Sequence, residues 1–229
     1  MFFWDYTMVI ILPALFLAMY AQTKVHGTFN KYLRVPAQSG LTGAQVARAL
    51  LDRYNLHDVR IEMINTGQLS DHYDPRSKTL RLSPDVYNGR TLASLGVAAH
   101  ETGHAIQHDV GYLPLALRNS IVPVANIGSQ AAFPLFFLGF LFGSENMMYI
   151  GIFAFAAAVL FQIITLPVEF NASNRAIEAL ESEGFITRSE VVPVKKVLSA
   201  AALTYVAATL MAVLQLVRLL VLAGMRRDE

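Results

Sequence analysis

The chain has 229 residues, of which 54% are hydrophobic and 15% are charged. Soluble domains carry roughly 25% charged residues, so this composition argues against a water-soluble domain. Lysine and arginine number 18 against 17 aspartates and glutamates, and this near balance provides no basic field that would attract nucleic acid. The absence of cysteine excludes disulfides, cysteine-ligated zinc and thiol catalysis.

Four long apolar runs without a charged side chain indicate that the chain spans a membrane. A helix needs about 20 apolar residues to cross about 30 Å of hydrocarbon. Buried core helices are the alternative, but too little polar sequence remains to cover four of them. Ionisable residues that would mark an ion path are missing from the runs, which disfavours a transporter. The runs are 6–23, 119–144, 146–168 and 197–217.

We interpret the first run as a retained membrane helix rather than a cleaved signal peptide. Its leader, Met1–Asp5, lacks the basic residues with which such peptides begin. Trp4 and Tyr6 at one end and Tyr20 at the other are typical of side chains that anchor a helix at the membrane interface.

Two polar segments, 24–118 and 169–196, separate the runs. Each follows an odd-numbered run, so both are expected on the same side of the membrane. Basic residues flank these segments, whereas Asp5 and Glu145 mark the other side. This bias predicts a multi-pass protein of the cell (inner) membrane with both segments, and the active site, on the cytoplasmic face. Arg226 and Arg227 count against that orientation. The flanking basic residues are Lys24, Lys31, Arg34, Arg118, Arg175, Lys195 and Lys196.

The first polar segment is expected to form a small unit of helices and short strands. Thr42 is a plausible N-cap, and helical spacing of apolar residues follows it. Alternating residues predict two strands, the second after a turn at 74–77, and the sheet they form is expected to rest on the helices. A helical stretch begins at Ser83 or Asp85. The expected helices are 42–54 and 91–108, and the expected strands are 59–64 and 79–82.

The segment His100-Glu101-Thr102-Gly103-His104 matches the pattern H-E-x-x-H inside a predicted helix. Residues four apart lie one turn apart on the same face, so the imidazoles of His100 and His104 converge and could bind one zinc ion. Glu101 lies beside that point, where it could accept a proton from water without binding the metal. Three ionisable groups in an otherwise apolar helix are costly to bury unless a metal or hydrogen bonds compensate.

A catalytic zinc usually has a third protein ligand. His108 continues the row, but it lies about 12 Å from His100 along a straight helix, too far to share one ion. Position 110, where a related protease pattern has histidine, is Val110. Glu169 is the better candidate, because the second polar segment begins there, on the same expected side of the membrane, and continues as a helix up to Gly184. Weaker rivals on the same helix are Glu178, Glu181 and Glu183.

Several segments together resemble the YugP-like neutral zinc metallopeptidases, a family of bacterial integral-membrane proteins similar to the HtpX-type gluzincins. The resemblance covers most of the chain, and although many families share the zinc motif, the combination is specific. The segments that carry it are DHYDP at 71–75, LRLS at 80–83, HETGHAIQ at 100–107, PVEFNAS at 167–173 and AALTYVA at 201–207.

The resemblance implies His100, His104 and Glu169 as zinc ligands and Glu101 as the general base. The HtpX pattern has an aspartate four residues after its glutamate ligand, where this chain has Ser173. Ser173 or Asn171 could therefore take the place of the carboxylate that usually supports a ligating histidine.

The expected reaction is hydrolysis of a peptide bond by zinc-activated water, with a membrane or unfolded polypeptide as substrate. The strand 79–83 could pair with the substrate backbone as an exposed edge. His72, Tyr73 and Arg175 are candidates for stabilising the oxyanion. The resulting candidate substrate-binding residues are His72, Thr79, Leu80, Arg81, Leu82 and Arg175.

The expected fold class is an integral membrane protein, mainly α with a small β-sheet, with about four transmembrane helices plus a gluzincin-like zinc protease unit. Its expected partners are a polypeptide substrate and the lipid bilayer, without nucleic acid. The alternative function is that of a zinc-binding membrane scaffold that cleaves nothing. The expected parts are membrane helices at 1–23, 119–144, 146–168 and 197–222, a protease unit at 24–118, and a third-ligand helix with its connection at 169–196.

Overall fold

The computed structural model describes residues 6–65 and 67–227, and side chains as far as Met225. The expected anchor Trp4 and the flanking Asp5 therefore lie outside the described residues, as do the side chains of Arg226 and Arg227. Over the described ranges the chain is mainly helical and carries a small three-stranded sheet, as the sequence predicts. The helices are η1 (Tyr6–Ile11), α1 (Leu12–Tyr32), α2 (Gly43–Arg53), α3 (Pro84–Tyr87), α4 (Leu92–Asp109), α5 (Leu113–Phe142), α6 (Glu145–Ser182) and α7 (Arg188–Arg227), and the strands are β1 (Arg60–Met63), β2 (His72–Asp74) and β3 (Thr79–Leu82).

Among the described residues, four helical segments are long and apolar enough to cross a membrane. All four extend beyond the apolar runs at one end or both. α1 continues through the polar residues after position 23 to Tyr32, and α5 begins at Leu113, before its run. A helix does not end where polarity changes, because its backbone hydrogen bonds are indifferent to side-chain charge. The segments are Tyr6–Tyr32, Leu113–Phe142, Glu145–Ser182 and Arg188–Met225.

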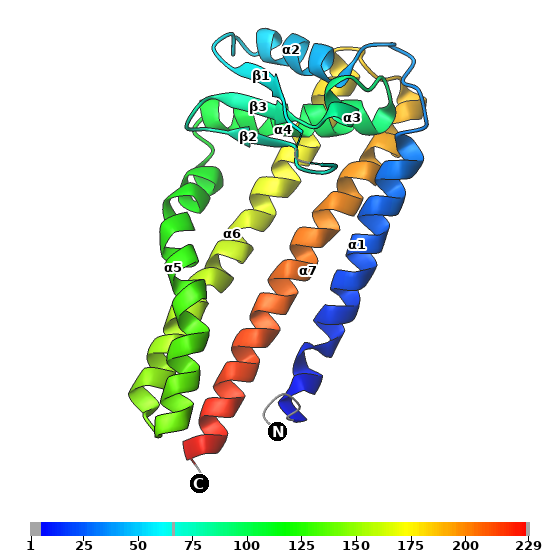
Figure 1. Cartoon of the computed structure of the whole chain (residues 1–229). Coiled ribbons are helices and arrows are strands. Elements are labelled where there is room, and N and C mark those ends of the chain that lie inside the picture. The colour runs from blue at the N-terminus through cyan, green and yellow to red at the C-terminus, as the bar shows by residue number, and fades with distance from the viewer. Residues whose placement is uncertain (1–5, 66, 228–229) are drawn as a thin grey trace. The chain divides into compact units, whose positions relative to one another are not determined.

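The third apolar run and the expected third-ligand helix form one continuous helix, α6 (Figure 1). Pro167 lies inside it without ending it. The helix ends at Ser182, shortly before Gly184, whose φ of 72° lies in the left-handed region that glycine adopts without strain. The stop predicted at Gly184 is therefore confirmed, whereas no helix boundary exists at Glu169.

The chain divides into two compact units. An apolar unit comprises Met1–Ala21, Ala116–Pro167 and Thr204–Glu229, and a mixed unit comprises Gln22–Leu115 and Val168–Leu203. The apolar unit has its own buried cluster, in which Phe136 of α5 and Met148 of α6 belong to the same group as Leu219 of α7. The mixed unit contains the sheet, α2, α3 and α4, and segments of α1, α5, α6 and α7.

The sheet of the mixed unit has the order β1-β3-β2. β3 pairs in parallel with β1, Arg60 facing Thr79, and antiparallel with β2, His72 facing Arg81. The expectation that 79–83 forms an exposed edge is therefore wrong, because β3 is hydrogen-bonded on both sides and three of its four side chains are buried. β2, which the sequence analysis missed, is an outer strand, and it packs against α4 (Figure 1).

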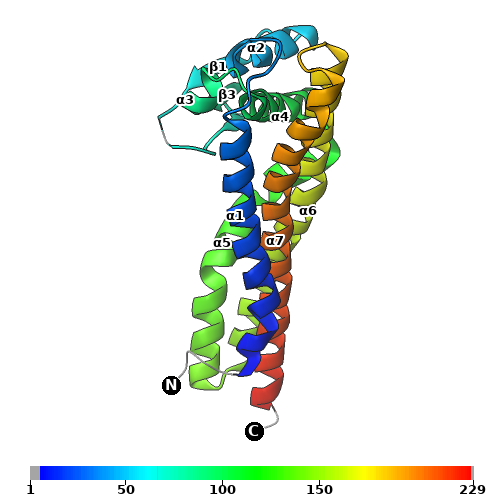
Figure 2. The same cartoon turned by 90° about the vertical axis from the view of Figure 1, so that its right-hand side faces the viewer.

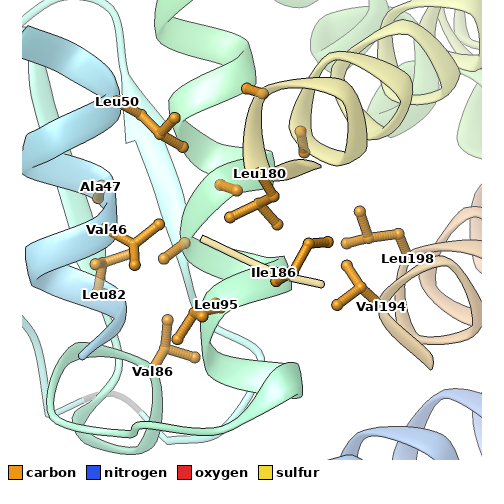
Figure 3. Packing of buried hydrophobic residues seen from close by; sticks show 14 of the residues in the cluster. Val46, Ala47, Leu50, Leu82, Val86, Leu95, Leu180, Ile186, Val194 and Leu198 are labelled. Atoms are coloured by element: carbon orange, nitrogen blue, oxygen red, sulfur yellow. The ribbon is translucent and has the colours of Figure 1, made fainter. Parts of the chain in front are cut away.

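α4 runs through the centre of the mixed unit, where α2 packs against it (Figure 2). Figure 3 shows the buried side chains around α4: residues of α2 on one side, and Leu180 of α6 and Val194 of α7 on the other. α2 begins with the predicted cap: the Thr42 hydroxyl accepts the amide of Gln45, whose side chain accepts the amide of Thr42 in return. This core fixes α4, which carries the H-E-x-x-H pattern.

Candidate metal centre

α4 holds His100 and His104 one turn apart, as the sequence predicts. Its N-cap is Thr91, whose hydroxyl accepts the amide of Ser94, and the helix ends just before Gly111, which has a φ of 62°. The two imidazole rings lie 4.8 Å apart between centroids, in an edge-to-face arrangement. Only 14% of the His100 side chain and 10% of the His104 side chain are exposed. The two rings therefore share a nearly dry site.

α6 brings the Glu169 carboxylate to both rings. Its Oε2 lies 3.3 Å from Nε2 of His100 and 3.6 Å from Nε2 of His104. Two ligands of a tetrahedral zinc, each about 2.0–2.1 Å from the ion, lie about 3.4 Å from one another. One donor atom from each of the three residues lies within 4.8 Å of the other two. The chemistry and the spacing of this donor set fit a zinc ion.

Gly103 allows α6 to approach α4 this closely. A Cβ atom at position 103 would lie 2.8 Å from the backbone oxygen of Ala172, which is closer than real Cβ contacts. Ala172 is itself fully buried and lies one turn beyond Glu169. The absent side chain of Gly103 thus lets the backbones of the two helices meet beside the imidazoles.

Glu101 is buried next to the three donors, and an outer strand holds it. Its Oε2 accepts the backbone N–H of Tyr73 in β2 at 3.0 Å. Burial raises the pKa of Glu101 to about 8, and the negative charges of Glu169 and Asp71 add to this rise. A carboxyl group with a pKa near neutrality can both take up and release a proton at physiological pH.

The ring nitrogens that point away from Glu169 have partners of their own. Nδ1 of His100 lies 3.1 Å from the hydroxyl of Ser173, and Nδ1 of His104 lies 3.0 Å from Oε1 of Gln107. Nε2 of Gln107 donates to Oδ1 of Asn171 at 3.0 Å. Ser173 thus contacts one imidazole directly, and Asn171 reaches the other through Gln107.

Other sequence candidates lie away from the three donors. His108 is exposed, and its Nδ1 lies 2.9 Å from the phenol oxygen of Tyr73. His72 is exposed too, with Nδ1 2.9 Å from the backbone oxygen of Ser70. Arg175 donates from Nε to Oδ1 of Asn171. The remaining candidates are also elsewhere: the glutamates Glu178, Glu181 and Glu183 are exposed, and Thr79, Leu80, Arg81 and Leu82 lie in the central strand.

Sequence reasoning assigned no role to Gln107 or Gly103. Gln107 follows His104 by three residues, so helix geometry places it on the same face, and this spacing was a readable signal. The packing of Gly103 against Ala172 had no such signal, because it depends on a helix more than sixty positions further along the chain. Nor does periodicity indicate that a backbone amide at position 73 would contact Glu101.

Comparisons with known proteins agree with this geometry. Residues 7–224 match a family model described as "Putative neutral zinc metallopeptidase". The chain is 51% identical over 218 residues to "Putative membrane protease YugP" of Bacillus subtilis (strain 168), and the match covers 95% of this chain and 96% of that protein. The search of solved structures finds no match. The predicted resemblance is confirmed, and zinc, the expected cofactor, suits both the family and the donor set.

Proposed function

The chain belongs to the neutral zinc metallopeptidase family, and on this premise we propose that it is a membrane-bound, zinc-dependent endopeptidase. Its substrates are membrane or unfolded polypeptides. The observation that carries the proposal is the convergence of His100, His104 and Glu169, with the buried Glu101 beside them. Three protein ligands leave one position of a tetrahedral site open for water or substrate, which is the arrangement of catalytic rather than structural zinc.

In this proposal His100, His104 and Glu169 hold the metal and Glu101 is the general base. Bound zinc supplies Lewis acidity, which polarises the scissile carbonyl group and lowers the pKa of water. Glu101 takes a proton from the attacking water and delivers it to the leaving amine. The amide of Tyr73 fixes the direction of the carboxylate while this happens.

The surroundings of the site favour turnover over simple storage of metal. The side chains of His100 and Glu169 are largely buried, so electrostatic interactions within the site are stronger than they would be in water. A scaffold protein that only held zinc would have no use for a buried carboxyl group beside the ligands, because burying it costs free energy. Glu101 is therefore the residue that separates the two functions.

The proposed orientation places the metal centre on the cytoplasmic face of the cell membrane. The support is the charge distribution along the sequence: Lys24, Lys31 and Arg118 flank the segments that supply the donors, and Glu145 is the first residue of α6, next to its short connection with α5. His100, Glu101 and His104 follow the first apolar run, and Glu169 follows the third, so the same face of the membrane is expected for all four.

The decisive experiment compares the purified full-length protein with Glu101→Gln. We expect the variant to retain wild-type zinc content and to lose cleavage of an unfolded substrate such as casein, by a factor of about 100 or more, since general acid–base catalysis contributes about that much. Glu178→Gln is the matched control, because Glu178 is an exposed glutamate of α6, and it should cleave normally.

The outcomes distinguish the functions. Appreciable cleavage by Glu101→Gln would reject Glu101 as the base. Stoichiometric zinc in a wild-type protein that cleaves no substrate, whether unfolded or embedded in a membrane, would favour the scaffold. Zinc retained after both Glu169→Ala and His104→Ala would reject the proposed ligands.

A further inference from the structure

Gln107 makes three hydrogen bonds although its side chain is fully buried. It lies one turn beyond His104 on α4, and its amide group faces two directions. Oε1 lies 3.0 Å from Nδ1 of His104, whereas Nε2 lies 2.8 Å from the backbone oxygen of Val168 and 3.0 Å from Oδ1 of Asn171. A buried glutamine with all of these contacts is costly to replace, because each lost partner leaves a polar atom in a dry site.

The partners of Gln107 fix which way its amide group points. The backbone oxygen of Val168 is an acceptor only, so the group that faces it is the NH₂ of Gln107. Oδ1 of Asn171 is likewise an acceptor, because it also receives the Nε–H of Arg175 at 2.8 Å, and a guanidinium group has no acceptor. Oε1 of Gln107 therefore faces His104, and it accepts a hydrogen bond that Nδ1 must donate.

We propose that Gln107, Asn171 and Arg175 are positioning residues, a chain of hydrogen bonds that sets the tautomer of His104. With Nδ1 held as a donor to Gln107, Nε2, which lies 3.6 Å from Oε2 of Glu169, is the ring nitrogen left for a metal ion. Arg175 and Gln107 both donate to Oδ1 of Asn171, and His104 donates to Oε1 of Gln107, so the obligate donor Arg175 fixes the amide of Asn171 and, through it, that of Gln107. The inference deepens the proposed function and rests on it only where His104 is taken as a metal ligand.

His100 lacks such a constraint. Its Nδ1 faces the hydroxyl of Ser173, and a hydroxyl group either donates or accepts. Ser173 therefore does not select between the two tautomers of His100, whereas Gln107 does select for His104. The two imidazoles differ in preorganisation, and the loss of Gln107 should weaken metal binding more than the loss of Ser173 does.

Asn171 offers the sharpest pair of variants. Its role uses only the oxygen of its amide, which accepts from both Gln107 and Arg175. Asn171→Asp keeps that acceptor in a side chain of the same shape, so zinc affinity should equal or exceed that of the wild type. Asn171→Leu has a similar volume and no acceptor, and Gln107→Met removes the amide itself. Removal of such supporting groups typically lowers metal affinity by about 10–100-fold, which we expect for both variants.

The experiment measures zinc dissociation constants of the full-length protein in detergent, by competition with a chromophoric chelator. Nitrogen-15 spectra of histidine-labelled, zinc-free protein give the tautomer of His104 independently of activity. We expect Nδ1 of His104 to carry a proton in the wild type and in Asn171→Asp, and to be protonated in only part of the molecules in Gln107→Met and Asn171→Leu. A role confined to packing would leave these resonances unchanged.

Two results would overturn the inference: wild-type zinc affinity in both Asn171→Leu and Gln107→Met, or a predominant Nε2–H form of His104 in the wild type. If Gln107→Met does not fold, the Asp and Leu variants of Asn171 still decide the question. Failure of the wild type to bind zinc would reject the proposed function instead, and the spectra of the zinc-free protein would still test the hydrogen-bond chain.

Discussion

Gly103 and Ala172 are in backbone contact, so closely that a single methyl group at position 103 would lie 2.8 Å from the carbonyl oxygen of Ala172. The two residues come from α4 and α6, the helices that carry the imidazoles and the Glu169 carboxylate. The spacing of these helices therefore decides whether the donors meet, and the first prediction tests it.

Gly103→Ala should weaken zinc binding and destabilise the protein by about 1–3 kcal/mol, because the new methyl group must push α6 away from α4. Zinc affinity and the thermal midpoint of the zinc-free protein measure the two effects. Gly27→Ala is the matched control: a Cβ there meets nothing within 4 Å, and alanine is the better helix former. Unchanged zinc affinity in Gly103→Ala would contradict the role given to this contact.

Zinc should stabilise the folded protein through the three donors. A ligand present at about 100 times its dissociation constant adds about 2.7 kcal/mol to the free energy of unfolding. Treatment with a chelator should therefore lower the thermal midpoint, and added zinc should restore it. Glu169→Gln, which lacks the carboxylate, should show a much smaller response to zinc. An equal response in that variant would show that the stabilising zinc lies at another site.

The ionised carboxylate of Asp74 should stabilise the folded protein, and this contribution should be lost in acid. Its carboxylate accepts hydrogen bonds from Ser77, Arg81 and the amide of Arg76, and these hold the pKa of Asp74 well below its ordinary value. An aspartate in the unfolded chain titrates near about 3.9. The stabilisation is therefore present above about pH 4 and is lost as pH falls below that value.

The measurement for Asp74 compares the thermal midpoints of the wild type and Asp74→Asn between pH 7 and pH 3. At pH 7 the wild type should be the more stable protein, and the two free energies of unfolding should differ by about 1 kcal/mol or less, since Asp74 is partly exposed and its ion pair with Arg81 is screened. This difference should shrink as pH falls. A difference that stays constant down to pH 3 would rule out this origin.

Thr42→Ala should cost about 1 kcal/mol, because it removes the hydroxyl that accepts the amide of Gln45 at the start of α2. α2 supplies Val46, Leu50 and Leu51 to the core around α4, so the loss should appear as a lower midpoint of the whole mixed unit. Ser39→Ala, in the exposed loop just before, is the control. Equal midpoints for the wild type and Thr42→Ala would mean that packing alone fixes the start of α2.

Membrane orientation is testable because the chain has no cysteine of its own. Ser39→Cys and Ser189→Cys place exposed thiols in the two polar segments, and Asn146→Cys places one in the first turn of α6, close to its connection with α5. In intact spheroplasts an impermeant thiol reagent should label only Asn146→Cys, whereas permeabilised cells should label all three. Labelling of Ser39→Cys from outside would reverse the proposed orientation.

The sequence predicted those features that depend on short-range spacing. The pair His100 and His104, the cap at Thr42 and the stop at Gly184 all follow from periodicity or from one residue's conformational preference, and the structure contains each of them. The order of the sheet did not follow, because alternation within 79–82 does not say which strands will lie beside it. β2 was missed since a strand of three residues is too short to show a period.

Long-range contacts explain the remaining differences. The predicted helix boundary at Glu169 rested on a change of composition, and a helix continues through such a change while its backbone bonds are satisfied. The amide of Tyr73 and the oxygen of Val168 act through the backbone, so their side chains gave no indication of these roles. Only tertiary packing places them next to α4.

The mixed unit is assembled from two separate stretches of chain, Gln22–Leu115 and Val168–Leu203, and the core around α4 takes Leu180, Val194 and Leu198 from the later one. During synthesis the ribosome completes both imidazoles long before the carboxylate that meets them. A nascent chain that has not passed Glu169 carries two donors of the three and an unfinished core. The order of translation thus delays completion of the donor set until α5 and the apolar part of α6 have been made.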